Sequence, residues 1–225
     1  MKNHCVDSKS QSNYQYEVHC GIKLRTLDCM KTSMTKDNIE LFLGVSDRIN
    51  KIYEGGFKIW DSQFDMIINN ILLSGKVLDL GCGLGCLGIY ALNSNCSVDF
   101  IDFNEQVIDI ATIPNAILNE CDLSKSRFFS GSWNDMDPLN KYNTIVAADV
   151  LYLKSNYPEI IAIIKKHLLI DGTCYIGTKI RYFGLDGDMI DFIDECNKNQ
   201  IHCSKKLVHS TGIKRYILTL RLISC

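Results

Sequence analysis

The sequence has no excess of basic residues and no long apolar run. It carries 24 lysines and arginines against 26 aspartates and glutamates, a formal net charge of −2. It therefore has no basic field of the kind that holds nucleic acid non-specifically. No run approaches the roughly twenty apolar residues that a membrane-spanning helix needs, and the first ten residues, MKNHCVDSKS, lack the apolar core of a signal peptide. We expect neither membrane contact nor direct nucleic-acid binding.

Clusters of metal ligands are missing as well. Eleven cysteines are a high count, but Cys82 and Cys86 have no second pair nearby that would complete a zinc site. The five histidines are scattered along the chain. In an apolar run such as GTCYIG, a cysteine behaves as a small buried hydrophobe. We expect no bound metal, and reduced thiols point to the cytoplasm or the nucleus.

Neither an internal repeat nor a linker divides the chain. Its 225 residues and 25.5 kDa suffice for one domain around a single core. From residue 76 onward, apolar strand-like runs alternate with helical patterns, which indicates a mostly parallel sheet covered on both faces. Two strand-like runs near the end are separated only by TGIK. This spacing predicts a hairpin and an antiparallel last strand.

Outside this region of alternating strands and helices, the secondary-structure patterns of the sequence are weaker. Residues 1–16 are polar and predict a loose segment. Residues 16–28 alternate enough for a strand, and a short helix is predicted around residues 35–43. Residues 59–73 place apolar side chains on one helical face. Residues 104–118 predict a helix in two pieces, broken ahead of Pro114.

The segment VLDLGCGLGCLG, residues 77–88, places the carboxylate of Asp79 just before a glycine-rich turn. Such a turn after the first strand of an α/β sheet lets a ligand approach the backbone closely. A pyrophosphate favours the amide groups at a helix start with no negative charge beside them. S-adenosylmethionine (SAM) carries a sulfonium and an ammonium group, which a carboxylate attracts. The turn therefore favours SAM over a dinucleotide.

Two further strand ends carry residues suited to a nucleoside. Asp102 ends the run SVDFID, where a carboxylate accepts hydrogen bonds from ribose hydroxyls in dehydrogenases and methyltransferases alike. In GSW, Gly131 allows a close approach, and Ser132 and Trp133 can meet an adenine through a hydrogen bond and a ring contact. A glycine turn can be merely structural, and a lone tryptophan is more often core. Three such features at strand ends together indicate a nucleoside site.

Longer stretches narrow the interpretation. SDRINKIYEGGFKIWDSQFDMI (residues 46–67), IDFNEQVIDIATIPNAILN, RFFSGSW and RYFGLDGD resemble, in the same order, the histidine protein methyltransferase family of the class I, Rossmann-like, SAM-dependent methyltransferases. The similarity covers roughly residues 46–221. We therefore divide the chain into an N-terminal extension, 1–45, and a methyltransferase domain, 46–225. The resemblance implies an α/β fold whose central sheet has about seven strands, the last antiparallel, with helices on both faces.

The resemblance also implies SAM as the cofactor and a histidine of a large-subunit ribosomal protein as the methyl acceptor; we expect a monomer. It implies that IWDSQ packs on the methionine end of SAM, that Asp102 and Phe103 contact the ribose and adenine, and that Ala148 lies beneath the adenosine. The complete set of expected SAM-binding residues is Ile59, Trp60, Asp61, Ser62, Gln63, Asp79, Gly81, Gly83, Asp102, Phe103, Gly131, Ser132, Trp133 and Ala148.

The strand-end motif ADVLY supplies the predicted catalytic pair, Asp149 and Tyr152. An attacking imidazole must be neutral, because a protonated one has no lone pair to donate. A carboxylate that accepts a hydrogen bond from the other ring N–H fixes the tautomer and stabilises the imidazolium that forms. We predict this role for Asp149, with Tyr152 lining the same pocket. The alternative is that Asp149 caps the following segment and Tyr152 only packs.

Other functions stay open at this point. Asp149 stands where the resemblance implies glutamate, and Asp-x-x-Tyr is the pattern of related lysine-directed methyltransferases, so a lysine acceptor is one alternative. Asp186 and Asp188 stand where glycines are expected, and Tyr182 and Phe183 in the same loop are either substrate contacts or core. An NAD-dependent oxidoreductase is disfavoured by the acidic residue before the glycine turn. An inactive nucleoside-binding scaffold is the remaining alternative.

Overall fold

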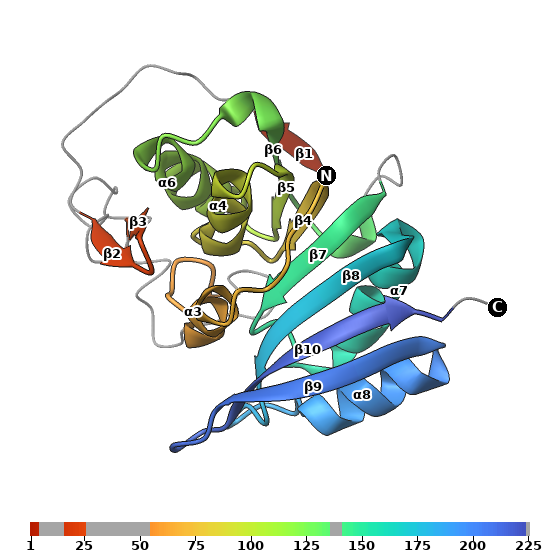
Figure 1. Ribbon diagram of the computed structural model, residues 1–225. Coiled ribbons are helices and arrows are strands. Elements are labelled where there is room, and N and C mark those ends of the chain that lie inside the picture. The colour runs from red at the N-terminus through yellow and green to blue at the C-terminus, as the bar shows by residue number, and fades with distance from the viewer. Residues whose placement is uncertain (5–15, 26–54, 136–140, 224–225) are drawn as a thin grey trace.

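A computed structural model describes residues 1–4, 16–25, 55–135 and 141–223. In these ranges one sheet has the strand order β1-β6-β5-β4-β7-β8-β10-β9 (Figure 1). Neighbours from β6 to β8 are parallel, whereas β1 is antiparallel to β6 and β10 to both β8 and β9. The strands are β1 Lys2–His4, β4 Lys76–Leu80, β5 Ser97–Asp102, β6 Ser126–Ser130, β7 Tyr142–Ala148, β8 Leu168–Lys179, β9 Ile201–His209 and β10 Arg215–Leu222.

This topology confirms the predicted α/β fold, with a mostly parallel sheet and an antiparallel last strand. The sheet has eight strands in the described residues, rather than about seven, because β1 joins its edge through pairs such as Lys2 with Ser130. The ammonium of Lys2 also pairs with the carboxylate of Glu105. A three-residue polar strand shows no hydrophobic alternation, so its sequence predicts a loose segment. The strand forms because the edge of β6 offers unpaired backbone groups.

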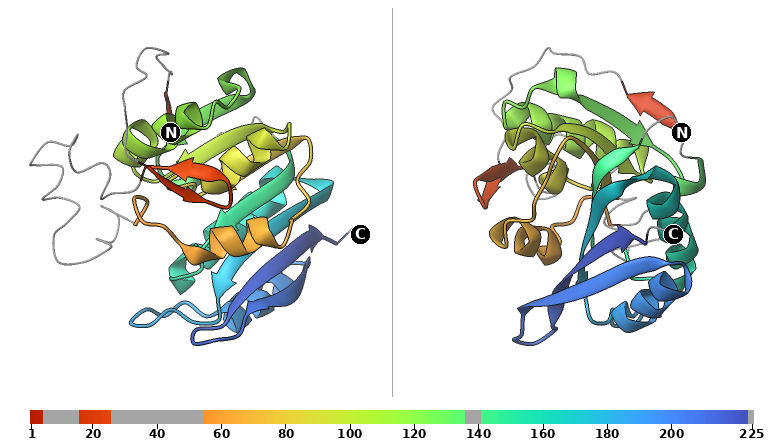
Figure 2. Two further views of the ribbon diagram at one scale, coloured as in Figure 1. Left: turned by 60° about the vertical axis from the view of Figure 1, so that its left-hand side comes forward. Right: turned by 45° about the vertical axis from the view of Figure 1, so that its right-hand side comes forward.

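Helices cover both faces of the sheet, as predicted (Figures 1 and 2). Side chains alternate along a strand, so Val77 faces one layer and Leu78 the other. The first layer holds α3 (Asp61–Ile68), α4 (Cys86–Asn93) and α6 (Ile113–Leu118), and the second holds α7 (Tyr157–His167) and α8 (Met189–Lys198). None of the helices in the described ranges is long and apolar enough to cross a membrane.

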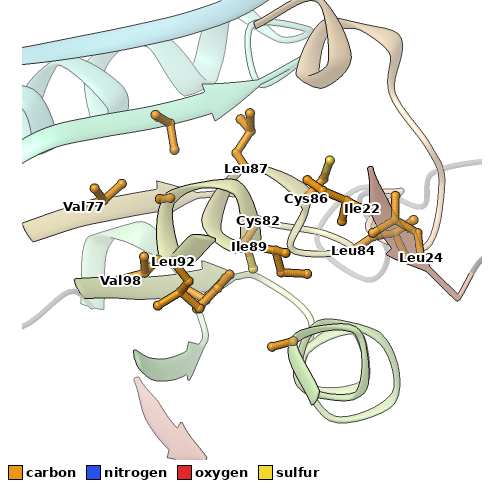
Figure 3. Close-up of a cluster of buried hydrophobic side chains, with 14 of the residues drawn as sticks. Ile22, Leu24, Val77, Cys82, Leu84, Cys86, Leu87, Ile89, Leu92 and Val98 are labelled. Carbon is orange, nitrogen blue, oxygen red and sulfur yellow. The ribbon is translucent and has the colours of Figure 1, made fainter. Parts of the chain in front are cut away.

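The first layer is closed by a small hairpin, β2 (Glu17–His19) and β3 (Ile22–Leu24). Figure 3 shows side chains of α4 lying between sheet residues such as Val77 and the hairpin residues Ile22 and Leu24. The single strand predicted over residues 16–28 is therefore wrong. Cys20 and Gly21 adopt positive φ angles of 50° and 80° and turn the chain back, since glycine takes this conformation at little cost. The helix predicted around residues 35–43 lies outside the described residues.

The helical segment after β5 is continuous where a break was predicted. An α-turn, α5 (Glu105–Val107), runs into a π-helical turn, Ile108–Thr112, and then into α6. Pro114 lies in the first turn of α6. Proline has no N–H for the usual bond to the fourth preceding residue, and here a wider turn rather than a break precedes it. Such π-turns are frequent near functional sites, and this one supports the glycine loop described below.

An ionic cluster around the buried carboxylate of Asp99 joins the amino ends of four strands. Asp99 on β5 accepts hydrogen bonds from Arg127 Nε and Nη2 at 2.8 and 2.6 Å and from the Tyr142 hydroxyl at 2.7 Å. Lys76 Nζ lies 3.3 Å from the same carboxylate. The arginine and tyrosine hydrogen bonds lower the pKa of Asp99 despite its burial. The cluster stands at the end of the sheet opposite the site described next.

Candidate active site

The carboxyl ends of β4, β5 and β7 border a cavity of about 520 Å³, within the size range of small-molecule sites. Three buried carboxylates lie at its wall: Asp79 on β4, Asp102 at the end of β5 and Asp149 directly after β7. The lining residues are Gly55, Gly56, Lys58, Trp60, Gln63, Asp79, Gly81, Cys82, Gly83, Leu84, Leu87, Asp102, Phe103, Ser132, Trp133, Asn134, Ala148, Asp149, Val150, Tyr152, Leu153, Ser155, Asn156 and Glu159.

The glycine loop between β4 and α4 packs too closely for side chains. Gly81 and Gly83 have φ angles of 70° and 52°, which L-residues with a Cβ rarely adopt. A Cβ on Gly83 would lie 3.0 Å from the carbonyl oxygen of Gly56. The π-turn holds the loop from outside, because Thr112 Oγ1 lies 2.7 Å from the Gly83 carbonyl oxygen. Asn115 Nδ2 donates to the next carbonyl, that of Leu84, at 2.9 Å.

Asp102 ties this loop to the end of β5. Its Oδ2 accepts a hydrogen bond from the Gly83 N–H at 2.9 Å, and its Oδ1 accepts one from the Asn104 N–H at 3.1 Å. A carboxylate has about four lone-pair positions, so two backbone bonds leave capacity for further donors. Paired ribose hydroxyls are donors of the required kind. The position of Asp102 at the cavity wall therefore suits a nucleoside.

Asp79 is a buried carboxylate that accepts one hydrogen bond from the described residues. Its Oδ2 accepts a hydrogen bond from the Gly88 N–H in the first turn of α4 at 2.8 Å. Burial raises the pKa of Asp79 to about 7, the hydrogen bond from Gly88 opposes this rise, and the nearby charge of Asp102 adds to it. A cation in the cavity would favour the ionised form. The residue thus combines a structural contact with a preference for a positively charged ligand.

Asp149 has an unusual backbone and an incompletely satisfied carboxylate. Its φ angle is 54°, in a region that Asp adopts more readily than most residues. Its Oδ1 accepts a hydrogen bond from the Tyr182 hydroxyl at 2.9 Å and lies 3.8 Å from Lys179 Nζ. Burial raises the pKa of Asp149, while Lys179, Ser62 and Tyr182 act in the opposite direction.

Three polar atoms near Asp149 lack a hydrogen-bond partner among the described residues. Ser62 lies close enough to lower the pKa of Asp149, yet its Oγ and Asp149 Oδ2 are both buried without a hydrogen bond of adequate geometry. Gln63 Nε2 is the third such atom. Gln63 and Asp149 belong to the residues that line the cavity, although these three atoms are themselves enclosed by protein.

The aromatic wall of this end of the cavity is Trp60. Lys58 Nζ and Lys179 Nζ lie 5.4 and 4.8 Å from the centroid of its ring, within the range of cation–π attraction. The indole N–H donates to the Gly55 carbonyl oxygen at 3.1 Å. Trp60 therefore contacts two ammonium groups, of which that of Lys179 also lies 3.8 Å from Asp149 Oδ1.

Helix α3, which follows Trp60, is attached to the sheet by Arg215 of β10. Arg215 pairs with Asp65 and, at 3.2 Å, with Asp61 Oδ2. This attachment places Ser62 and Gln63 on the inner side of α3, where both are buried. Asp61 faces away from the cavity and serves the ion pair instead.

The structure brings most of the predicted site residues together. Trp60, Gln63, Asp79, Gly81, Gly83, Asp102, Phe103, Ser132, Trp133, Ala148, Asp149 and Tyr152 all line the one cavity. Ile59, Asp61, Ser62 and Gly131 do not line it; Ile59 packs on the first-layer core, and Gly131 donates its N–H to the Asp102 carbonyl oxygen. The roles of all these residues toward SAM and the acceptor stay predictions.

Sequence reasoning missed several lining residues. Lys58 and Gly56 lie in the YEGG…KIW stretch, where only the family resemblance drew attention. Asn134 and Glu159 are joined by a hydrogen bond of 2.8 Å between Asn134 Nδ2 and Glu159 Oε1. They come from segments 25 residues apart in the sequence, and no local pattern connects them. Within the described ranges, no three His, Cys, Asp or Glu side chains are grouped to hold a metal ion.

Both sequence and fold are similar to known methyltransferases. A family model described as a methyltransferase domain matches residues 71–211. The chain is 38% identical to a histidine protein methyltransferase 1 homologue of Dictyostelium discoideum over 68% of this chain and 52% of that protein. It is 30% identical to the Mus musculus homologue over 97% of this chain and 71% of that protein. The chain thus spans only about half of the first relative's length.

Among solved structures, the glycopeptide N-methyltransferase MtfA in complex with SAM has a TM-score of 0.57 to this chain. The two share 10% identity over 72% of this chain and 93% of that one. At this identity the likeness concerns the fold alone.

Proposed function

The chain belongs to the methyltransferase domain family and, within it, to the histidine protein methyltransferases, and from that premise we propose that it methylates a histidine side chain of a protein. One observation carries the proposal. Asp149 Oδ2 is a buried carboxylate oxygen without a hydrogen-bond partner in the described residues, at the wall of a cavity that suits SAM. This oxygen is enclosed by protein, and we infer that it accepts the N–H of an acceptor imidazole once that side chain has entered the cavity.

The cofactor is SAM, and the residues of the cavity fit it. When bound, SAM supplies a methyl group on a sulfonium, which is already a good leaving group. We assign Asp102 to the ribose hydroxyls, Asp79 to the positive charge and Gln63 Nε2 to the carboxylate of the methionine end. The glycines of the loop let the ligand lie close to the backbone.

The protein's part in the transfer is mainly positioning. In-line attack needs the acceptor nitrogen at about 3 to 3.5 Å from the methyl carbon, with its lone pair aligned. Asp149 Oδ2 accepts the hydrogen bond from the other ring N–H, which selects the tautomer and raises the basicity of the attacking nitrogen. The same carboxylate then stabilises the positive charge that the ring acquires. Tyr152 lines the cavity and provides one wall for the ring.

The charges around Asp149 favour histidine over lysine as the acceptor. An imidazole with a pKa near 6.5 is mostly neutral at pH 7, whereas a lysine side chain arrives as a cation. That cation would approach the ammonium groups of Lys58 and Lys179 beside Trp60. The Asp-x-x-Tyr pattern of Asp149 and Tyr152 keeps lysine methylation as the second candidate.

We further propose that the acceptor protein is a large-subunit ribosomal protein and that the enzyme acts as a monomer in the cytoplasm or the nucleus. The resemblance over residues 46–221 supports the substrate, and the scattered cysteines support a reducing compartment.

The experiment is to incubate the protein with SAM carrying a labelled methyl group and large ribosomal subunits, and to map the label by mass spectrometry. Label on one histidine supports the proposal. Label on a lysine replaces it with the second candidate. If SAM fails to raise the melting temperature while NAD raises it, the chain is not a methyltransferase, because a ligand of the folded state must stabilise that state.

A further inference from the structure

Tyr182 lies in the segment between β8 and α8, and its ring is buried at 6% exposure. Its hydroxyl lies 2.9 Å from Asp149 Oδ1 and 3.0 Å from Thr178 Oγ1. We propose that Tyr182 is a positioning residue, which holds Asp149 by Oδ1 and keeps it ionised so that Oδ2 remains for the acceptor imidazole. The inference rests on the role of Asp149 proposed above.

The hydrogen-bond chain has one consistent direction when Asp149 is ionised. An ionised carboxylate only accepts, so the single proton of the Tyr182 hydroxyl is donated to Oδ1. The Thr178 hydroxyl has one proton and two acceptors within reach, the Tyr182 oxygen at 3.0 Å and the Lys179 carbonyl oxygen at 3.1 Å. When it donates to Tyr182, the linked donors polarise one another and strengthen the bond to Asp149. The arrangement therefore stabilises the charged carboxylate and fixes its rotation.

Other charged groups near Asp149 do not replace this bond. Lys179 Nζ, on β8, stands at 3.8 Å, beyond hydrogen-bond distance. Ser62, on α3, lowers the pKa of Asp149 through its hydroxyl and its backbone N–H, but its hydroxyl makes no hydrogen bond of standard geometry with a described residue. Arg215, on β10, is close enough for the charge of Asp149 to raise its pKa, but its guanidinium is paired with Asp65 and Asp61. Tyr182 is thus the described residue that donates a hydrogen bond of standard length to this carboxylate.

The backbone around Tyr182 is held independently of its hydroxyl. The Gly187 N–H donates to the Tyr152 carbonyl oxygen at 3.1 Å, and the Ile180 N–H donates to the Lys214 carbonyl oxygen at 3.0 Å. The Tyr182 ring also meets the Tyr152 ring edge-on, with centroids 6.5 Å apart. Replacement by phenylalanine should keep the ring and remove only the donor.

The test measures the pKa of Asp149 directly, by carbon-13 NMR of protein labelled at aspartate, with Asp149→Asn assigning the resonance. In Tyr182→Phe the pKa should rise by about one pH unit, the size that loss of a buried hydrogen bond to a charged group implies. Thr178→Val, which removes the second donor, should shift it in the same direction by less. An unchanged pKa in both variants overturns the inference.

A matched control exists at the opposite end of the sheet. Tyr142→Phe removes a buried hydroxyl bonded to a different aspartate, Asp99, and should leave the pKa of Asp149 unchanged. If Tyr182→Phe does not fold, Thr178→Val alone decides, because its side chain is nearly isosteric with threonine. A Thr178→Val pKa equal to that of the unaltered protein then counts against the proposal.

Activity gives a second readout, using large ribosomal subunits as the methyl acceptor. The acidic limb of the kcat profile should move to higher pH in Tyr182→Phe, with SAM affinity unchanged by calorimetry. Protonation of the acceptor imidazole contributes to this limb equally in both proteins. A difference between the two acidic limbs therefore reports a change in the pKa of Asp149. If Asp149→Asn remains fully active, the proposed function of Asp149 fails. If Asp149→Asn is inactive but Tyr182→Phe keeps the original profile, only this inference fails.

Discussion

Asp149 combines three costs at a single residue: a left-handed backbone, burial, and a carboxylate oxygen without a partner in the described residues. Such strain persists in proteins where function requires it. Asparagine tolerates the same backbone conformation and carries no charge to desolvate.

We expect Asp149→Asn to lower kcat by about 10²-fold or more, the range that loss of an acid–base group produces. SAM affinity should stay unchanged, and the melting temperature should not fall, because no buried charge remains. Methyl-transfer assays measure kcat, titration calorimetry with SAM measures its affinity, and thermal unfolding measures the melting temperature. Unchanged methyl transfer would remove Asp149 from the mechanism.

Asp79 predicts a pH dependence of folding. Its pKa is about 7 in the folded protein against an ordinary value of 3.8. Between these values the folded state binds more protons than the unfolded state, so the contribution of Asp79 to stability is full below pH 3.8 and is lost as the pH rises through 7. Asp79→Asn keeps an acceptor for Gly88 and removes this titration.

The measurement is the free energy of unfolding in urea, for both proteins, across this pH range. Relative to Asp79→Asn, the original protein should lose free energy of unfolding steadily as the pH rises to 7. Saturating SAM should reduce that shift, because its positive charge favours the ionised carboxylate. Two parallel stability curves would contradict the assignment.

At the same scale, the sequence predicted acidic residues that line the cavity. Asp79 was predicted because a carboxylate beside a glycine turn attracts a cationic ligand, and Asp102 because a carboxylate at the next strand end accepts hydrogen bonds from ribose hydroxyls. Lys58 and Glu159 were not predicted, because charged residues are usual on a surface and only the fold brings these two to one cavity. Asp61 and Gln63 share a short motif, yet the helical turn points one outward and buries the other.

At the scale of elements, helix α3 depends on a distant strand. Arg215 on β10 reaches Asp65 and Asp61 on α3, and α3 carries Gln63 to the cavity wall. We expect Arg215→Met to weaken SAM binding by about tenfold, the effect of losing one ligand hydrogen bond of roughly 1.4 kcal/mol. Isothermal calorimetry measures it.

Arg221→Met is the matched control, since Arg221 lies on the same strand and is exposed. It should bind SAM as the original protein does. Equal affinity in Arg215→Met would mean that α3 keeps its place without the ion pair.

Element prediction succeeded where hydrophobic periodicity is long and failed where tertiary contacts decide. The alternation of strand-like runs and helical patterns predicted from residue 76 onward is found in the structure, with the apolar strands β4, β5 and β7 and the amphipathic helices α7 and α8. The turn at Cys20 and Gly21, the π-turn before Pro114 and strand β1 were not predicted. Each depends on a neighbour: the hairpin on α6, the π-turn on the glycine loop, and β1 on the edge of β6.

At the scale of the whole molecule, the two ends of the sheet carry different tasks. The Asp99 cluster joins four strands at their amino ends, and the cavity lies at the carboxyl ends. Asp99→Asn leaves Arg127 without its buried partner. Because the Arg127 side chain is 43% exposed, water screens the charge left behind, and we expect a loss of about 1–3 kcal/mol in the free energy of unfolding, measured in urea, with SAM affinity unchanged. If Asp99→Asn bound SAM much more weakly while its free energy of unfolding was unchanged, the two ends of the sheet would not have separate tasks.

That division has a practical consequence for protein engineering. A combinatorial library confined to segments 153–156 and 183–186, which are exposed or half-buried, would diversify residues next to the cavity while every member retains Tyr152, Tyr182 and the anchor at the far end of the strands. Selection from such a library would explore new acceptor preferences with few variants lost to aggregation.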